Sequence, residues 1–196
     1  GGGVTVTVPV QVYSAPASED RVWLDAASIH VAGQERAENQ RGYNLVAIDP
    51  ASGIVLGRGS FDLGLDYDAD RNAIRADAPQ NRAMREFLHA FPQGTPIAGA
   101  IRDNAANLLQ LETVEALRGI GLELDLRERY RWSHAFIGVV GAPPGSGLEV
   151  ASSDPCGLLL VKPGERPPSE QTIRTGDPRI DSNLLLSDSL LEAGGQ

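Results

Sequence analysis

Two stretches decide the fold: residues 127–141, RERYRWSHAFIGVVG, and residues 40–49, QRGYNLVAID. In each, arginine precedes a run of apolar residues that is typical of a strand in the interior of a sheet. Both stretches therefore place a cation at the mouth of a buried sheet. This arrangement suits the binding of a polar ligand better than a reaction on one.

The remaining pattern predicts further strands and two helices around this pair. Alternating valines predict a half-buried strand over 4–13, with Pro9 at an edge or a bulge. Apolar residues at helical spacing predict amphipathic helices. The other predicted strands are 22–31, 43–48, 54–58, 95–102 and 135–140, and the helices are 80–91, capped by Asn81, and 108–120, with Leu108, Leu111, Val114 and Leu117 on one side.

The composition changes after residue 141. Residues 143–147, PPGSG, are typical of a linker, and 157–161 adds one more candidate strand. Residues 163–196 are rich in Pro, Gly, Ser and Asp, with one apolar patch at 180–191. We therefore expect one domain over 1–142, and a linker with an extended C-terminal arm over 143–196.

Composition and charge exclude several classes of partner. The 196 residues carry a net charge of -9, which repels nucleic acid and anionic membrane surfaces. No apolar run approaches the length of a transmembrane helix, so we expect no direct membrane insertion. The start, GGGV, shows no signal peptide and no initiator methionine, from which we expect either a processed product or a piece of a larger protein. The single cysteine, Cys156, excludes an internal disulfide and fits either a reducing compartment or an extracytoplasmic protein that is stable without one.

Six segments occur in an order that resembles a known family. They are 41–53 (RGYNLVAIDPASG), 60–62 (SFD), a helix closed by 91–94 (FPQG), 100–104 (AIRDN), a helix ending in glycine, and 131–138 (RWSHAFIG). Over roughly residues 4–142 the chain is similar to the interleukin-like EMT inducer family, also called PANDER-like. Its members include secreted cytokine-like proteins, cell-surface hyaluronan-associated proteins and the stem of the glycosyltransferase that adds N-acetylglucosamine to O-mannose. We expect a bacterial or phage member.

The resemblance implies an α+β fold, with two packed antiparallel β-sheets and two flanking helices. In the glycosyltransferase stem it implies a pocket for a terminal β-linked N-acetylglucosamine, contacted by two arginines and an aspartate. The matching positions here are Arg41, Asp103 and Arg131. The chain departs from the family pattern at Trp132 and His134, in its lack of the cytokine disulfides, and in its longer acidic loop over 62–81.

The chemistry of these three residues suits a sugar. An arginine offers several donors in a fixed fork, and a carboxylate accepts from two adjacent hydroxyl groups. Trp132 and Tyr130, together with Tyr43, are candidates for an aromatic stacking face. The alternative is an Arg–Asp–Arg ion-pair network that closes the end of a sheet and has only a structural role.

Other patterns predict neither a metal site nor catalysis. Residues 66–77 place aspartates as in a calcium loop, but Arg71 replaces the required glycine and Asp77 the bidentate glutamate, so a solvated acidic loop is favoured. The histidines show no metal-binding spacing, and His134, within a strand, is expected to be packed and hydrogen-bonded. Cys156 lies in no catalytic motif. We expect no enzyme, no metal and no cofactor.

These expectations combine into a function with one alternative. We expect a non-catalytic glycan-recognition domain of a larger extracytoplasmic protein, either secreted, at the cell surface or in a virion. The alternative is a structural or protein-interaction module, for example in a phage tail or a cell-surface protein. In that case residues 163–196 make contacts within a homo-oligomer or with the parent protein. Loss of sugar binding without unfolding in Asp103→Ala distinguishes the first from the second.

Overall fold

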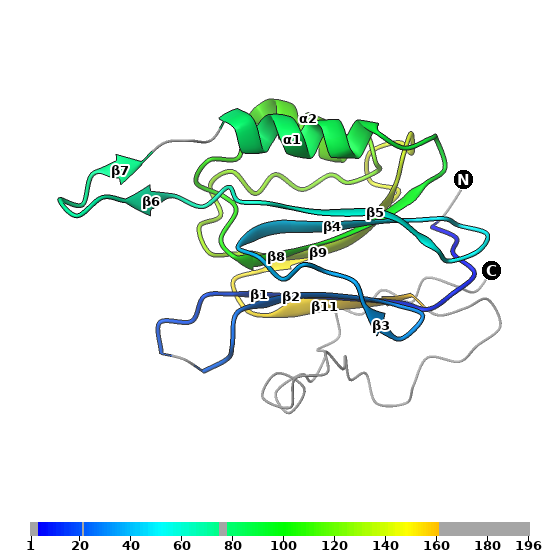
Figure 1. Cartoon of the computed structure of the whole chain (residues 1–196), viewed down its shortest axis with the longest axis horizontal. Helices are drawn as coiled ribbons and strands as arrows, with labels where there is room; N and C mark the ends of the chain where they lie inside the picture. The colour runs from blue at the N-terminus through cyan, green and yellow to red at the C-terminus, as the bar shows by residue number, and fades with distance from the viewer. Residues whose placement is uncertain (1–3, 21, 75–77, 161–196) are drawn as a thin grey trace.

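The structure is a computed structural model that describes residues 4–20, 22–74 and 78–160. It is an α+β fold in which two layers of sheet lie one above the other and two helices cover the outer face of one layer (Figure 1). The helices are α1 (Ala78–His89) and α2 (Leu111–Arg118). No helix within the described ranges has the length and apolar character needed to cross a membrane.

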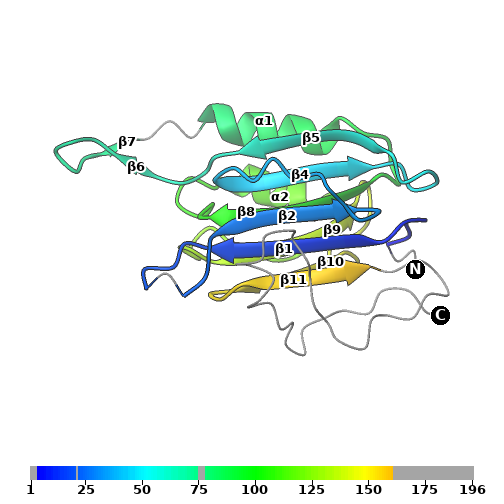
Figure 2. The ribbon, with the colours of Figure 1, turned by 60° about the horizontal axis from the view of Figure 1, so that its bottom comes forward.

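The layer beneath the helices is antiparallel throughout. Its strands follow the order β5-β4-β8-β9-β10. Figure 2 shows β5, β4 and β8 side by side in this layer. The bounds are β4 (Gly42–Ile48), β5 (Val55–Phe61), β8 (Pro96–Asp103), β9 (Ser133–Val139) and β10 (Leu148–Ser152).

The second layer has the order β3-β2-β1-β11, again antiparallel. A short parallel pairing joins it to the first layer, because Ala15 of β1 lies beside Arg102 and Pro16 beside Asp103. The predicted pair of packed sheets is therefore confirmed, with the addition that they are continuous as one open, mixed sheet. The bounds are β1 (Val10–Pro16), β2 (Ala26–Val31), β3 (Gln34–Glu35) and β11 (Cys156–Leu160).

The side chains of β4 alternate between two cores, as expected of a strand covered on both faces. Tyr43 and Leu45 belong to the cluster beneath the helices. Val46 and Ile48 belong to the cluster between the two layers. All seven residues of β4 are buried, which confirms the prediction of an interior strand at this position.

Three details differ from the sequence predictions. The first strand begins at Val10 and not at residue 4, although Val6 is still buried against the core between the layers. Leu111 is 45% exposed, because α2 starts at that residue and its buried side is formed by Thr113, Val114, Ala116 and Leu117. Asn81 does not cap its own helix.

Asn81 lies inside α1 and connects it to the start of α2. Its side chain is fully buried, and its Nδ2 donates to the carbonyl oxygen of Leu108 at 2.7 Å. Its Oδ1 accepts from the Gln110 amide at 3.0 Å and from the Thr113 hydroxyl at 2.7 Å. It therefore satisfies a free N–H group at the beginning of the other helix.

The chain after residue 142 differs from the expected linker. β10 pairs with β9 and β11 pairs with β1, so both add to the sheet. Every residue of β11 is buried, and Leu158 belongs to the core between the layers. The strand expected over 157–161 is thus present, while the predicted arm over 163–196 lies outside the described residues.

Candidate functional site

The segment that leads into β4 fixes the first arginine. Asn44 is fully buried, and its side chain binds the backbone of the residues before it. Its Nδ2 donates to the carbonyl oxygens of Gln40 at 2.7 Å and Gly42 at 3.2 Å, and its Oδ1 accepts from the Gln40 amide at 2.9 Å. Arg41 lies inside this closed loop, so its position at the strand entrance is set by the backbone.

Arg41 forms a two-pronged ion pair with Asp62, which follows β5. Its Nε lies 2.9 Å and 3.0 Å from the two carboxylate oxygens, and its Nη2 lies 2.8 Å from Oδ2. Asp62 also accepts from the Gly64 amide at 3.0 Å. This geometry orients the guanidinium group as well as neutralising it.

Asp103 and Arg131 both adopt left-handed backbone conformations, with φ of +62° and +52°. Such φ values are uncommon for residues other than glycine and often occur at functional sites. Asn104 holds the two segments together, because its buried Oδ1 accepts from the amides of Ala106 at 3.1 Å and Arg131 at 3.2 Å. Its amide nitrogen donates to Asn107.

These segments enclose a pocket of about 210 Å³. It contains four of the five predicted site residues, namely Arg41, Asp103, Tyr130 and Arg131. Trp132 is not among its described lining residues and packs against the core beneath the helices, where the Arg129 guanidinium lies 4.7 Å from the ring centre. The full described lining is Arg41, Gly64, Leu65, Asp103, Asn104, Asn107, Tyr130 and Arg131.

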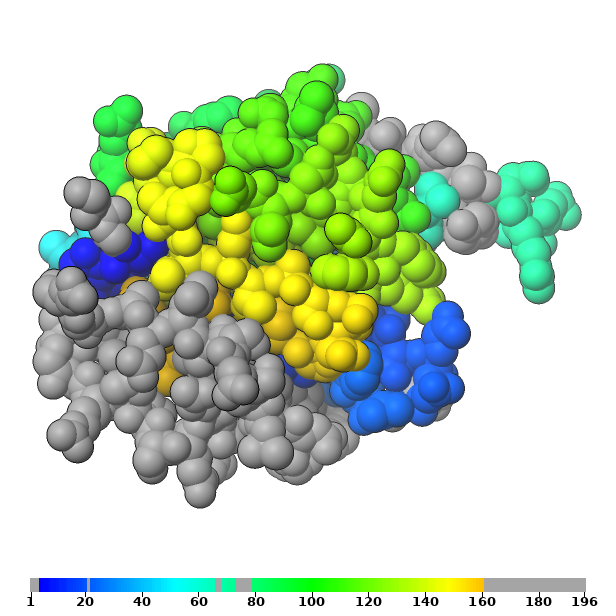
Figure 3. Space-filling model, turned by 180° about the vertical axis from the view of Figure 1, so that it is seen from behind, coloured from blue at the N-terminus to red at the C-terminus, as the bar shows by residue number. Residues whose placement is uncertain are grey.

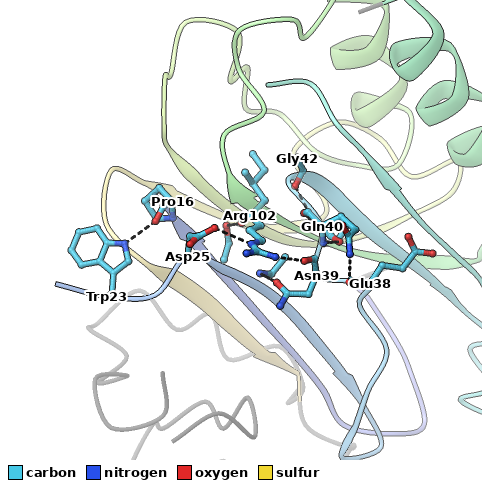
Figure 4. Close-up of polar contacts among 12 residues, drawn as sticks. Pro16, Trp23, Asp25, Glu38, Asn39, Gln40, Gly42 and Arg102 are labelled. Carbon is cyan, nitrogen blue, oxygen red and sulfur yellow. Dashed lines mark hydrogen bonds and ion pairs between the residues drawn. The ribbon is translucent and has the colours of Figure 1, made fainter. Parts of the chain in front are cut away.

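The arginines around this pocket pair with acids other than Asp103. Nη1 of Arg131 lies 2.8 Å from Glu19, and its guanidinium lies 5.1 Å from the centre of the Tyr130 ring. Arg102 is not among the described lining residues; its Nε binds Asp25 at 2.9 Å and its Nη1 donates to the Asn39 carbonyl at 2.5 Å (Figure 4).

Asp103 itself makes no side-chain hydrogen bond or ion pair with any residue that the structure describes. The expected alternative, an Arg–Asp–Arg network, therefore does not form. The three side chains meet at one pocket, and the carboxylate between them is left for another partner.

The comparison with protein families bears on this pocket directly. Residues 41–142, just over half of the chain, match the family described as interleukin-like EMT inducer, or ILEI. The chain belongs to the ILEI family. The matched segment of this ILEI domain begins at Arg41 and contains all five predicted site residues. The bacterial or phage origin that we expected is not borne out by this match. No curated protein matches the chain.

Burial is the main influence on the Asp103 carboxyl group of the ILEI domain. It raises the pKa of Asp103 above its ordinary value, and the nearby charge of Asp25 acts in the same direction. The charges of Arg131, Arg41 and Arg102 lower this pKa but do not overcome the other two influences. The folded domain therefore holds this carboxylate at a cost in stability, as binding sites often do.

Asp103→Asn is expected to stabilise the ILEI domain at neutral pH. A raised pKa means that the wild type loses stability as pH rises above 3.8, the ordinary aspartate value, through the folded pKa. The asparagine avoids that loss and tolerates the same left-handed φ. The gain is about 0.5 kcal/mol, since Asp103 is only half buried and water screens its charge. Urea unfolding should show this gain over the wild type at neutral pH and no gain below pH 3.8. If the variant and the wild type are equally stable at both pH values, the raised pKa of Asp103 is contradicted.

A second polar cluster lies in the core, on the sheet next to the site. The hydroxyl of Tyr43 lies 3.1 Å from Nδ1 of His134, and Nε2 of His134 lies 3.0 Å from Glu149. Because a carboxylate only accepts, Nε2 donates to Glu149, which leaves Nδ1 of His134 to accept from the Tyr43 hydroxyl. Burial, followed by the charges of Glu149 and Asp125, raises the pKa of Tyr43, which keeps it a neutral donor. Tyr43 and His134 are fully buried, so His134 is packed and hydrogen-bonded as expected.

The acidic loop forms a projecting hairpin of β6 (Asp66–Tyr67) and β7 (Ala73–Ile74) (Figures 1 and 3). Asp68 accepts from the amides of Asp70 at 2.9 Å and Asn72 at 2.8 Å, and from the Asn72 side chain at 3.0 Å. These bonds lower the pKa of Asp68, and the bond from the Asn72 amide has the largest effect. Its oxygens thus hold the turn. Within the described ranges, no three His, Cys, Asp or Glu side chains are grouped to bind a metal.

Proposed function

We propose that this ILEI domain is a non-catalytic recognition module that binds the end of a glycan in the pocket between Arg41, Asp103 and Arg131. The single observation that carries the proposal is the carboxylate of Asp103. It is half buried, faces the pocket and has no hydrogen-bond donor among the described residues. Polar groups removed from water are usually paired, so a ligand with donor groups is the expected partner.

The other lining groups complement a sugar. The Nε–H of Arg131 is buried and lacks an acceptor in the described part of the chain, so it suits a ligand oxygen or a bridging water. Asn107 is exposed at the rim and offers an amide. Tyr130 is 56% exposed and provides apolar surface for the face of a ring.

The size of the pocket supports a single terminal ring. At about 210 Å³ it is smaller than the roughly 300–1,000 Å³ typical of sites for drug-sized ligands. One sugar unit is therefore the natural occupant, with the rest of the glycan outside. From the family resemblance we propose a terminal β-linked N-acetylglucosamine.

We also propose an extracytoplasmic location for the parent protein. The state of Cys156 is compatible with an oxidising environment, because the thiol is buried and its burial raises its pKa to about 11. A thiol with so little thiolate at neutral pH reacts slowly with oxidants and disulfides. The domain would then need no disulfide to survive there.

The proposal is tested by nuclear magnetic resonance titration with the methyl β-glycoside of N-acetylglucosamine. We expect saturable shifts of the Tyr130 and Arg131 amide signals, with an affinity in the weak range typical of a single site. Asp103→Asn should weaken binding at least about tenfold, because a hydrogen bond to a charged group contributes about 1.5–3 kcal/mol.

Glu86→Gln is the matched control, since it removes one carboxylate charge from an exposed position on α1 outside the pocket. Its affinity should equal that of the wild type. If no sugar shifts the pocket signals while the protein is folded, the glycan proposal fails and the alternative of a structural or interaction module is favoured.

A further inference from the structure

The charges around the pocket do not cancel. Three guanidinium groups in the described residues each have their own carboxylate, in the pairs Arg41–Asp62 at 2.8 Å, Arg102–Asp25 at 2.9 Å and Arg131–Glu19 at 2.8 Å. Asp103 is the fourth carboxylate and has no such pair. These seven groups therefore leave one net negative charge, and it lies on the pocket wall.

We infer that the pocket selects glycan ends by charge, so that it accepts a neutral sugar and rejects one that carries a sulfate or a carboxylate. This inference rests on the proposed function and adds the class of sugar to it. It depends on the acidic partners that the structure places beside Arg41 and Arg131, namely Asp62 and Glu19.

The small volume of the pocket brings a bound sugar close to the negative charge on the pocket wall. In a pocket of about 210 Å³ any bound group lies within a few ångströms of the lining, where water is largely displaced and charges interact more strongly than in bulk solvent. Among the single charges that act on the Asp103 carboxylate, the negative charge of Asp25 has the largest influence, ahead of Arg131, Arg41 and Arg102 taken one at a time.

Glu19 provides a way to change the selectivity without changing the lining. Its side chain is 83% exposed and neutralises Arg131 from outside the pocket. Glu19→Gln should leave the guanidinium of Arg131 without a counter-charge. The variant should therefore tolerate an anionic sugar better than the wild type does.

The experiment compares the methyl β-glycoside of N-acetylglucosamine with its 6-sulfate, titrated into the full chain at an ionic strength of ~10 mM, where charges act over ~30 Å. We expect the wild type to bind the sulfated sugar at least about tenfold more weakly. Glu19→Gln should reduce this preference at least about threefold, because it exposes one positive charge. Glu86→Gln also removes one negative charge, but from α1 outside the pocket, and it should keep the wild-type preference for the neutral sugar.

Ionic strength separates charge from size. At ~1 M salt the range of the charges falls to ~3 Å, so an electrostatic preference should narrow and a steric one should persist. Equal binding of the two sugars by the wild type, or a preference that neither salt nor Glu19→Gln alters, overturns the inference and leaves the glycan proposal standing. Binding of neither sugar overturns the proposed function, and the inference with it.

Discussion

Gly42→Ala is expected to destabilise the domain by about 2–5 kcal/mol. Gly42 has a φ of +95°, and a Cβ at this position would lie 2.1 Å from the carbonyl oxygen of Phe61 and 2.8 Å from the Cα of Asp62. The left-handed backbone alone costs about 1–2 kcal/mol for a residue with a side chain. Displacing the backbone of the neighbouring strand adds about 1–3 kcal/mol. Since 1 kcal/mol corresponds to about 2–4 °C in a chain of this size, the melting temperature should fall by about 10 °C.

Gly33→Ala is the matched control for this prediction. Gly33 also has a positive φ, +78°, but a Cβ there would meet no atom within 4 Å. It should therefore lose only the conformational contribution, about 1–2 kcal/mol. Thermal and urea unfolding of the two variants measure the difference. Equal losses would show that the contact with Phe61 does not matter.

His134→Leu is expected to destabilise the domain by about 3–5 kcal/mol. The substitution leaves the carboxylate of Glu149, whose side chain is 11% exposed, without the Nε2–H group that donates to it, and removes the acceptor of the Tyr43 hydroxyl. A buried polar group that loses its partner costs about 1–3 kcal/mol, and a charged group costs more, so the two losses together reach this range. Urea unfolding at neutral pH measures the loss.

A double variant identifies the cause of that loss. In His134→Leu/Glu149→Gln the buried charge is gone, and the glutamine oxygen can still accept from the amides of Glu123 and Leu124, as Glu149 does at 2.6 Å and 3.1 Å. The double variant should be more stable than His134→Leu alone, a non-additive result. If it is less stable, the loss comes from packing.

The hydrogen-bonded Glu149 carboxylate also makes the stability of the domain depend on pH in the acid range. Burial acts to raise the pKa of Glu149, but the hydrogen bond and charge of His134, with the amides of Glu123 and Leu124, outweigh it and lower this pKa below 4.5. Its contribution to stability is therefore complete above pH 4.5 and is lost as pH falls through the lower folded value. Glu149→Gln should lack this part of the acid dependence.

The sequence was sufficient to predict the strands of the sheet interior. An unbroken apolar run predicts an interior strand whatever lies beside it, so β4 and β9 were expected at nearly their observed positions. Asn81 was misassigned because a polar residue near a helix start usually caps that helix. Its actual partners, such as Gln110, follow from the packing of two helices and not from local preference.

The site was predictable only in part, because some of its contacts join residues that are distant in the sequence. The family resemblance brought Arg41, Asp103 and Arg131 together, but their acidic partners are distant in sequence: Glu19 is 112 residues from Arg131. Trp132 was expected beside Tyr130 in the pocket. The left-handed conformation of Arg131 changes the chain direction directly before Trp132, and an arginine, unlike glycine or asparagine, does not signal that conformation.

The short parallel contact between β1 and β8 has a consequence for the unit that folds. Pro16 lies beside Asp103, so the residue at the heart of the pocket is aligned by a strand that precedes the family-matched segment. Isolating residues 41–142 would also strip β1, β2 and β11 from the core between the layers. The limits of sequence similarity are thus narrower than the limits of cooperative folding. Any experiment on ligand capture needs the flanking strands in place.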